Sequence, residues 1–504
     1  MKKLLSIILL ITSILSLSCN HNKLNSSLAS SIGKVGEITV NPLGVTPLSA
    51  VYTTETVNAA PITVTVKGLY GEPDIIHTYP AGYGTEFEIH GMFPESQNTI
   101  EVNDGGRIIT KNINIGSLST SDNTTIQKQY NVEINELSEE KYTNNPELYF
   151  ILNGGLNNFV VAISKNGFVR YFLNYRASKI TINNKKMIFY PTYEAKNVNL
   201  LGFEMVKYPT GTHHDTIKVN NNYLYLSHSQ WGAEDRVVEM DSSGKEIRKL
   251  SFAKLIENTL DLVSYPEDDA ILKEIAYTED INNIYNDNSG KKVVNWFHAN
   301  SLVYDSSTDI LYVSSRDHAV LAIDYSEWKL IWWMADSKLN TVPPIDGYDK
   351  FFKDLKSLEV YRAKGDGLDD GPKNQHALFL LANGNLGMFD NQGDENTNPN
   401  GSRYVEYKIT GSFGNYMAQK VYEYRDSSLY SRIMSDVDFT GENYENLLFV
   451  YAYPTARILE IEKNSKRELF KLSLPFATYR VDKLPLYYDE GRVYSEDCNL
   501  KNPN

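Results

Sequence analysis

The first part of the chain alternates apolar and polar residues between turn residues. The stretches EITVNPLG, PITVTVKG, TEFEIHGM, NTIEVND and GRIITKNINIG lie between Gly36 and about Thr125. Alternation with a period of two predicts β-strands, and the Gly, Pro and Asn residues between them predict turns. We therefore expect residues 35–128 to form a small β-sandwich domain.

A longer repeat follows from Leu148 onward. Each unit has a strand, a turn with Asn, Asp or Gly, a strongly apolar strand and a strand that ends in a charged hairpin. Six such units occur, over residues 151–175, 180–206, 213–252, 297–334, 375–424 and 434–474. Four antiparallel strands per unit predict an all-β chain with a six-bladed β-propeller in residues 148–504, joined to the sandwich by a linker, residues 129–147. A long array of β-sandwiches is the alternative.

Two insertions break the strand pattern. Within residues 252–288 the stretches AKLIENTLDLV and EDDAILKEIAY have helical spacing, and so does DKFFKDLKSLEVYRA from Asp349. Insertions of this kind normally emerge on one rim of a propeller.

The charge of the chain argues against one class of partner. The formal net charge is -14, and no stripe of Lys and Arg is present. A nucleic-acid-binding surface needs such a stripe to displace counterions from phosphates, so we expect no nucleic-acid partner.

The N-terminus has the pattern of an export signal. Two lysines precede an apolar run that ends at Cys19. Residues 1–19 resemble a bacterial lipoprotein signal, whose Cys19 becomes the lipidated first residue of the mature chain. Simple secretion is the alternative, because Ser16 stands where leucine is usual. Residues 20–34 are then a flexible tether, and we expect a protein of the periplasm or cell surface that a lipid anchors to a membrane.

The other cysteine of the chain is Cys498. If Cys19 is lipidated, no internal disulfide can form, although an oxidising compartment would permit one. No transmembrane helix is predicted after the signal.

Histidines recur at the start of successive units. His214 and His376 each lie ten residues before the leucine of the following strand, and His298 heads the unit between them, thirteen residues before its leucine. Ser435 heads the last unit. Because the innermost strand of each blade faces the propeller axis, we expect these residues to converge on one central site. The alternative for any single histidine is a hydrogen-bonded structural residue.

The unit that begins at His298 adds an amide and a cation. Asn300 lies two residues further on, hence on the same strand face. Arg316 ends the next strand, where its guanidinium can bind two oxygens of an anion; an ion pair with Asp317 is the alternative. Three histidines can hold zinc, but no carboxylate heads a repeat and an arginine would repel the ion, so we expect no metal. The set suits a tetrahedral oxyanion, with one imidazole free to act as a nucleophile.

These motifs resemble the propeller of the bacterial periplasmic arylsulfate sulfotransferases. The matching segments are His213-His214-Asp215, Trp296-Phe297-His298-Ala299-Asn300 with Ser314-Ser315-Arg316, and Asn374-Gln375-His376. GEITVNPLGVTPLSAV and ITVTVKG are similar to the immunoglobulin-like domain of that family. The resemblance covers about residues 35 to 480 and implies a β-propeller preceded by an immunoglobulin-like β-sandwich.

The resemblance also implies an activity. It is the transfer of a sulfuryl group from an aryl sulfate donor to a phenolic acceptor, without a nucleotide donor or other cofactor and by ping-pong kinetics. The absence of a Gly-rich phosphate-binding loop agrees. His376 would attack sulfur and form a sulfohistidine. The family also suggests a homodimer.

The resemblance assigns the remaining roles as well. Arg316, His298 and Asn300 would hold the sulfuryl oxygens. His214 would be the general acid and base for the phenolic oxygen; His213 is the other choice, but adjacent strand residues face opposite ways. Ser435 would make a hydroxyl contact that a threonine makes in the family.

Two alternatives come from other functional classes. One is a surface propeller that binds anions or glycans without turnover. The other is a metal-dependent hydrolase. The chain departs from well-known family members in lacking an internal disulfide and in its predicted lipid anchor.

Overall fold

The computed structural model describes most of the chain. The described residues are 32–120, 124–138, 141–153, 158–183, 186–190, 196–207, 212–229, 232–260, 284–286, 292–316, 319–338, 355–393 and 400–488. The predicted signal with Cys19, most of the predicted tether, and Cys498 lie outside them. Among these residues no helix has the length and apolar character that a membrane crossing requires.

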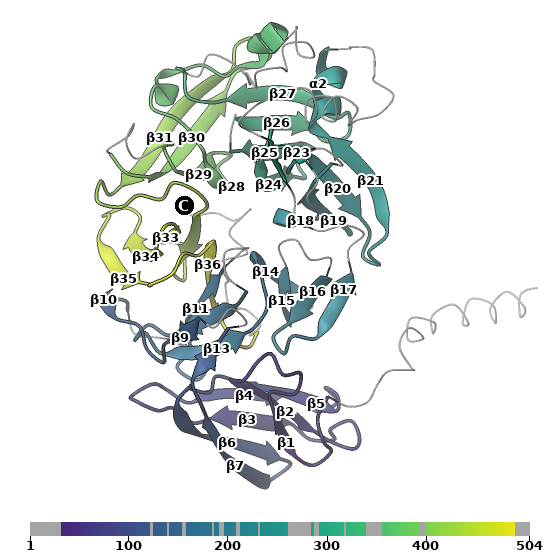
Figure 1. The fold of residues 1–504 in the computed structure, drawn as a ribbon, viewed down its shortest axis with the longest axis vertical. Coiled ribbons are helices and arrows are strands. Elements are labelled where there is room, and N and C mark those ends of the chain that lie inside the picture. Colours follow the sequence, from purple (N-terminus) through teal and green to yellow (C-terminus); the bar gives the residue numbers. More distant parts are fainter. Residues whose placement is uncertain are drawn as a thin grey trace, which may run out of the picture.

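Two antiparallel sheets form the N-terminal domain, with strand orders β1-β2-β5 and β4-β3-β6-β7 (Figure 1). The strands are β1 (Ile38–Val40), β2 (Ser49–Thr53), β3 (Ile62–Val66), β4 (Ile75–Tyr79), β5 (Glu86–His90), β6 (Ser96–Asp104) and β7 (Arg107–Ile115). Alternate residues of β3, Ile62, Val64 and Val66, are buried in one core with Phe87 and Ile89 of the other sheet. The predicted β-sandwich is confirmed. A short hairpin, β8 (Leu118–Ser119) and β9 (Thr125–Ile126), follows it.

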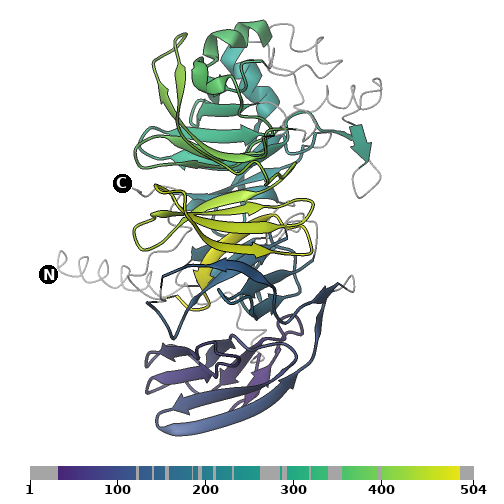
Figure 2. The same cartoon turned by 90° about the vertical axis from the view of Figure 1, so that its left-hand side faces the viewer.

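Six antiparallel sheets then surround a central axis in the described part of the chain, and we number them as blades 1 to 6 (Figure 1). The side view shows the N-terminal sandwich below them (Figure 2). Blades 1 to 3 contain β11 (Glu147–Leu152), β12 (Val160–Ile163), β13 (Val169–Leu173), β14 (Lys179–Asn183), β15 (Lys186–Tyr190), β16 (Lys196–Asn199), β17 (Glu204–Lys207), β18 (His213–Val219), β19 (Asn222–Ser227), β20 (Arg236–Met240) and β21 (Glu246–Ser251). Blades 4 to 6 contain β24 (Ala299–Asp305), β25 (Ile310–Ser315), β26 (Val320–Asp324), β27 (Lys329–Met334), β28 (His376–Leu380), β29 (Leu386–Asp390), β30 (Arg403–Thr410), β31 (Met417–Arg425), β32 (Asp436–Thr440), β33 (Asn446–Tyr451), β34 (Arg457–Glu462) and β35 (Glu468–Ser473). The predicted propeller is confirmed.

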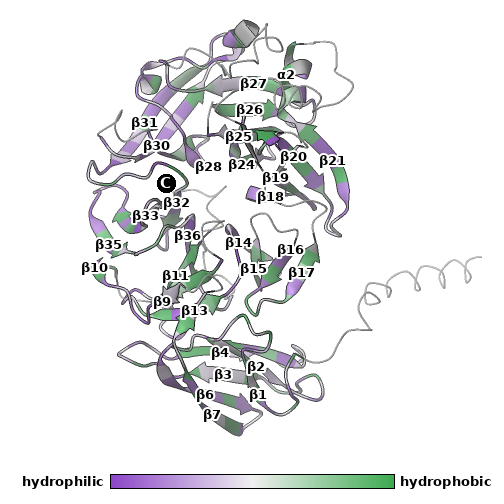
Figure 3. Cartoon of the chain, in the orientation of Figure 1, coloured by the Kyte–Doolittle hydropathy of each residue, from purple (hydrophilic) through white to green (hydrophobic). Residues whose placement is uncertain are grey.

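The middle strands of the blades are apolar on both faces because neighbouring blades pack against both. All residues of β12 are buried, and β26 is buried except at its last residue. The outer strand β31 instead has several exposed residues. Figure 3 shows this difference, with β26 largely hydrophobic and β31 largely hydrophilic.

The innermost strand of blade 1 comes from the other end of the propeller sequence. Strand β36 (Arg480–Pro485) pairs antiparallel with β11, from Leu152↔Arg480 to Glu147↔Pro485. This pairing closes the ring and leaves β11 without a free edge.

Part of the segment predicted as a linker is a strand. Strand β10 (Val132–Asn135) pairs with β35 and becomes the fifth strand of blade 6. Its sequence, VEIN, alternates apolar and polar residues, and that pattern suits an outer strand with one face exposed.

The first insertion begins with the predicted helix, α2 (Phe252–Leu260), and includes a hairpin, β22 (Ile284–Asn286) with β23 (Lys292–Val294). The stretch EDDAILKEIAY lies outside the described residues. In the second insertion the described part forms 3-10 helices, η2 (Leu355–Tyr361) and η3 (Asp366–Leu368).

A buried ion pair joins the N-terminal domain to blade 1. Arg170 on β13 lies 3.3 Å from Glu72, and its Nε donates to the carbonyl of Gly91 at 2.9 Å. Both side chains are at most 2% exposed. Removal of either partner would leave an uncompensated buried charge, so this pair fixes the domain on the propeller.

Candidate active site

The inner strands of blades 3, 4 and 5 are irregular at their first residues. Pairing shifts between His213 and Thr216 in β18, between Ala299 and Ser301 in β24, and between His376 and Phe379 in β28. Such a β-bulge leaves residues outside the ladder and re-aims their side chains. The repeat positions that the sequence singled out therefore coincide with three bulges.

The bulge in β18 turns two adjacent histidines to the same side. His214 has a φ of 52°, a left-handed conformation that few non-glycine residues adopt. Its ring centroid lies 3.9 Å from that of His213, with the planes nearly perpendicular. The expectation from strand alternation that His213 points away from His214 is therefore wrong, because the alternation stops at the bulge.

The structure brings the three predicted histidines together. The ring centroid of His214 lies 5.1 Å from that of His298 and 6.4 Å from that of His376. The Nε2 atoms of His214 and His298 are 3.2 Å apart. Each imidazole comes from a different blade. The order of the blades around the propeller axis therefore creates the cluster.

Arg316 lies at the same end of the inner strands. Its backbone N donates to the carbonyl of His298 at 3.0 Å, and its carbonyl accepts from Asn374 Nδ2 at 3.3 Å. Asp317, the alternative ion-pair partner, lies outside the described residues.

His376 is held in one tautomer. Its Nδ1 lies 2.8 Å from Asn391 Oδ1 and 2.9 Å from the carbonyl of Asn374. The Asn391 amide cannot be reversed, because its Nδ2 donates to the carbonyls of Ser431 and Met434 at 2.8 and 3.0 Å. Two oxygens can only accept, so they assign the proton to Nδ1 and leave the lone pair on Nε2.

The cluster is neutral in its resting state. Burial lowers the pKa of His214 and of His298 well below the usual value, and the charge of Arg316 and the neighbouring rings lower both further. Burial also lowers the pKa of His376, to about 4, although the Asn391 hydrogen bond opposes this shift. At neutral pH His376 is thus a neutral imidazole with a lone pair on Nε2, as a nucleophile must be.

The two predicted polar residues contact the backbone around His376. Asn300 Nδ2 donates to the carbonyl of Gln375 at 2.7 Å, next to His376. Ser435 Oγ accepts from Ala452 N at 3.2 Å, and the preceding residue Met434 places its N–H 3.3 Å from His376 Nε2. Both residues therefore support the strand or the turn beside the nucleophile candidate.

Sequence reasoning missed a buried carboxylate. Glu234, from the β19–β20 connection, lies with Oε1 3.1 Å from His213 Nδ1 and with Oε2 3.2 Å from His298 Nδ1. It is 3% exposed. Glu234 does not head a repeat, and nothing in the sequence of its loop predicts that it lies beside the histidines.

Sequence reasoning also missed Tyr479. Its hydroxyl lies 2.8 Å from His214 Nδ1. Tyr479 directly precedes β36, so it heads the inner strand of blade 1 as the histidines head theirs. The signal was the strand-like stretch ATYRVDK after the sixth unit, which belongs to the first blade.

A metal ion has a geometric candidate here. Ligand atoms of His213, His214 and Glu234 lie within 4.8 Å of one another. However, both ring nitrogens of His214 already face hydrogen-bond partners, and the Glu234 oxygens face His213 and His298. The cationic Arg316 is close as well, so we do not assign these residues as metal ligands.

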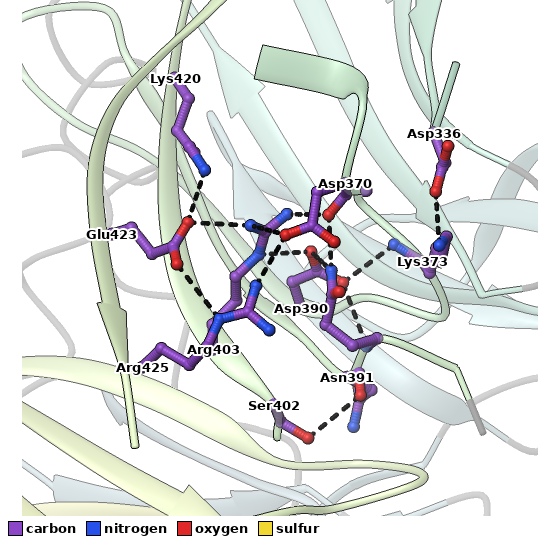
Figure 4. Close-up of polar contacts among 12 residues, drawn as sticks. Asp336, Asp370, Lys373, Asp390, Asn391, Ser402, Arg403, Lys420, Glu423 and Arg425 are labelled. Carbon is purple, nitrogen blue, oxygen red and sulfur yellow. Dashed lines mark hydrogen bonds and ion pairs between the residues drawn. The ribbon is translucent and has the colours of Figure 1, made fainter. Parts of the chain in front are cut away.

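An ion-pair network supports the segment that leads to His376 (Figure 4). Arg403 is fully buried, and its Nε donates to Asp390 Oδ2 at 2.9 Å. Its Nη1 contacts Asp370 at 3.0 Å and Glu423 at 2.9 Å. Asp390 also accepts from the backbone N of Lys373 at 2.9 Å. The network therefore ties residues 370–373 to strands β29, β30 and β31.

Charged side chains fill the axial channel next to the histidines. The channel holds a cavity of about 60 Å³ that residues from all six inner strands line. Its ionisable residues are Lys179, Asp215, Asp436, Asp438, Arg480 and Asp482. Burial raises the pKa of Asp436 to about 7 and that of Asp482 to about 6. Burial and the neighbouring carboxyl groups also raise the pKa of Asp438 well above its usual value. Protonation of two of the four acids matches them to the two cations.

Comparisons with known proteins agree with this arrangement. A model of the arylsulfotransferase (ASST) family matches residues 133–480, and a model of the arylsulfotransferase Ig-like domain matches residues 37–115. Among solved structures, the β-propeller domain of Cps50 (Swd1) from Myceliophteria thermophila covers 71% of this chain and 96% of its own, at 10% identity and a TM-score of 0.34. That score is too low to add to the fold assignment.

Two curated relatives share part of the sequence. Arylsulfate sulfotransferase AssT of Escherichia coli O6:H1 (strain CFT073) is 24% identical over 246 residues, which are 41% of this chain and 38% of that protein. Arylsulfate sulfotransferase AssT of Lelliottia amnigena is 25% identical over 279 residues, 46% of this chain and 43% of that protein. The chain thus matches less than half the length of either relative.

The family assignment rests on the matches to the two domains. The first model extends from β10 to the start of β36, well over half of the chain, and the second lies on the N-terminal sandwich. On these grounds the protein belongs to the arylsulfotransferase family.

Proposed function

We propose that this protein moves a sulfuryl group from a phenolic sulfate ester to an acceptor phenol through a sulfohistidine at His376. The orientation of His376 carries the proposal. Its Nδ1–H is held by Asn391 and by the carbonyl of Asn374, so Nε2 keeps a lone pair at neutral pH. Family membership and the names of the curated relatives support the same reaction.

The reaction has two half-reactions that share one enzyme bond. In the first, His376 Nε2 attacks sulfur, the N–S bond forms, and the S–O bond to the aryl group breaks. The leaving phenolate takes a proton. In the second, an acceptor phenol gives up a proton and its oxygen attacks sulfur, the N–S bond breaks, and the lone pair returns to His376. Two displacements through one covalent intermediate give ping-pong kinetics.

The neighbouring side chains suit the charge of the transferred group. Arg316 stabilises the sulfuryl oxygens, and so does His298 once its Nε2 carries a proton, because donors in a buried site stabilise developing charge. His214 exchanges the proton with the phenolic oxygen. Asn300 and Ser435 position His376 through hydrogen bonds to the backbone of the strand and turn around it. The Met434 N–H bond to His376 Nε2 is long at 3.3 Å, so an incoming sulfur atom can replace it at little cost.

The test follows nitrophenol release from 4-nitrophenyl sulfate with and without phenol. We expect release that depends on phenol, is insensitive to a chelator, and disappears in His376→Asn. Incubation with the donor alone should add one sulfuryl group to the peptide that contains His376. His77→Asn is the matched control, because His77 lies on β4 of the N-terminal domain and stacks on Tyr487, which follows β36. Anion binding without turnover would refute the proposal, as would an activity that chelation removes.

We also propose that the protein is exported and that a lipid on Cys19 anchors it to a membrane, as the N-terminal sequence suggests. Cys19→Ser should move the protein from the membrane fraction to the soluble fraction. Equal partition of the variant and the wild type would contradict the anchor.

A further inference from the structure

Four side chains form a continuous hydrogen-bond chain through the cluster. His298 Nδ1 donates to Asn295 Oδ1 at 2.9 Å, and a carboxylate oxygen of Glu234 lies 3.2 Å from the same nitrogen. These oxygens assign the proton to Nδ1. His298 Nε2 is then an acceptor, so His214 Nε2–H donates to it across 3.2 Å. His214 Nδ1 in turn accepts from the Tyr479 hydroxyl at 2.8 Å. The resting chain therefore runs in one direction, from Tyr479 to Asn295, and the Glu234 carboxylate lies beside its end at His298.

Donor binding conflicts with this resting arrangement. A sulfuryl oxygen is an acceptor, and the lone pair on His298 Nε2 cannot donate to it. His298 must gain a proton before it can bind the anion, although burial and the charge of Arg316 lower its pKa. Glu234 offers the compensating negative charge, because its carboxylate contacts the Nδ1 atoms of both His298 and His213.

We propose that Glu234 is a positioning residue through which His298 takes up one proton on donor binding, and that this proton replaces the one that His214 delivers to the leaving phenolate. The inference rests on the proposed function. Glu234 does not touch the substrate; it stabilises the imidazolium that does.

The proton balance closes over the two half-reactions. In the first, His214 Nε2–H passes to the phenolate oxygen as the S–O bond breaks, and His298 Nε2–H refills His214. Both rings are then neutral again. In the second, the acceptor phenol returns its proton along the same path as its oxygen bonds to sulfur. Loss of that proton to solvent accompanies release of the product.

The first experiment compares two donors in Glu234→Gln. Glutamine keeps the shape and one acceptor oxygen but not the charge. 4-Nitrophenyl sulfate releases a stable phenolate that needs no proton, whereas phenyl sulfate releases a basic one. In single turnovers we expect the variant to lose about 100-fold with phenyl sulfate and less than about tenfold with 4-nitrophenyl sulfate, the range of general acid catalysis. Glu234→Asp, which keeps the charge, should recover part of the phenyl sulfate rate.

Equal losses with both donors would overturn the inference, because a structural defect does not depend on the leaving group. Glu239→Gln is the matched control: Glu239 lies in the same blade, pairs with Arg248 at 2.6 Å and should show no donor dependence. If the wild type transfers no sulfuryl group, the proposed function fails instead. The two failures are therefore distinguishable.

The second experiment does not require a variant at position 234. Phenyl sulfate binding to His376→Asn, which cannot react, is measured by calorimetry at pH 7.5 in two buffers of different ionisation enthalpy. We expect uptake of about one proton per bound donor. Binding without proton uptake would overturn the inference.

Discussion

The axial channel makes stability depend on pH in a way that one substitution should reveal. Asp436 and Asp438 on β32 face Asp482 and Arg480 on β36, Asp215 on β18 and Lys179 on β14. Replacing Asp436 with asparagine keeps the size of the side chain and removes its titration. We expect Asp436→Asn to raise the free energy of unfolding at pH 8 and to change it much less at pH 5.

The magnitude follows from the pKa shift. Burial raises the pKa of Asp436 from 3.8 to about 7, so the folded protein holds this proton more tightly than the unfolded chain. Its stabilising contribution is fully present below about pH 4 and is lost as pH rises to about 7. At 1.36 kcal/mol per pKa unit the whole effect is at most about 4 kcal/mol, of which about 3 kcal/mol falls between pH 5 and pH 8.

The assay is thermal or denaturant unfolding of the variant and the wild type from pH 5 to pH 8. The buried histidines act with the opposite sign, because their lowered pKa values reduce stability as pH falls below about 6.5, but they contribute equally to both proteins. Asp241→Asn, in a surface turn, should shift stability by a constant amount, since the pKa of Asp241 is lowered from 3.8. If the difference between Asp436→Asn and wild type is the same at every pH, the reasoning is refuted.

The other predictions concern catalysis and the supporting network. Donor-only labelling of His376 should keep its rate down to about pH 5, because its pKa is about 4; a decline that begins near pH 6.5 would contradict the neutral resting state. Asn391→Ala should slow that labelling at least about tenfold because the Nδ1–H tautomer of His376 loses an acceptor, as misassigned tautomers do elsewhere, while donor binding stays intact in a calorimetric titration. Tyr479→Phe should slow phenyl sulfate turnover and spare 4-nitrophenyl sulfate; equal effects on both would exclude it from the proton path. Arg403→Met should cost about 3–5 kcal/mol in denaturant unfolding because it removes the ion-pair partner of the buried Asp390, and an unchanged midpoint would contradict this role of the pair.

Repetition explains how much of the site was visible in the sequence. The head positions of His214, His298 and His376 were predicted because each blade repeats the same strand order around one axis. Tyr479 was not predicted because the inner strand of blade 1 lies more than 300 residues after its sheet partner β11. A repeat search that proceeds along the chain assigns such a strand to no unit.

The remaining residues depend on local backbone geometry. The β18 bulge turns His213 toward His214, and a strand period of two cannot represent such an irregularity. Glu234 and Asn391 reach the histidines from loop or strand-end positions whose side-chain directions only the folded blades determine. The sequence therefore predicts which strands meet at the axis, whereas hydrogen-bond partners require the structure.

The closing strand has a consequence for how activity appears during folding. β36 pairs with the edge of β11 that would otherwise be free. The residue just before β36, Tyr479, completes the contacts of His214. A ring that has not yet closed lacks both, even when the other five inner strands are in place. The proposed sulfuryl transfer would then report closure of the ring, and molecules with an open ring would lack it.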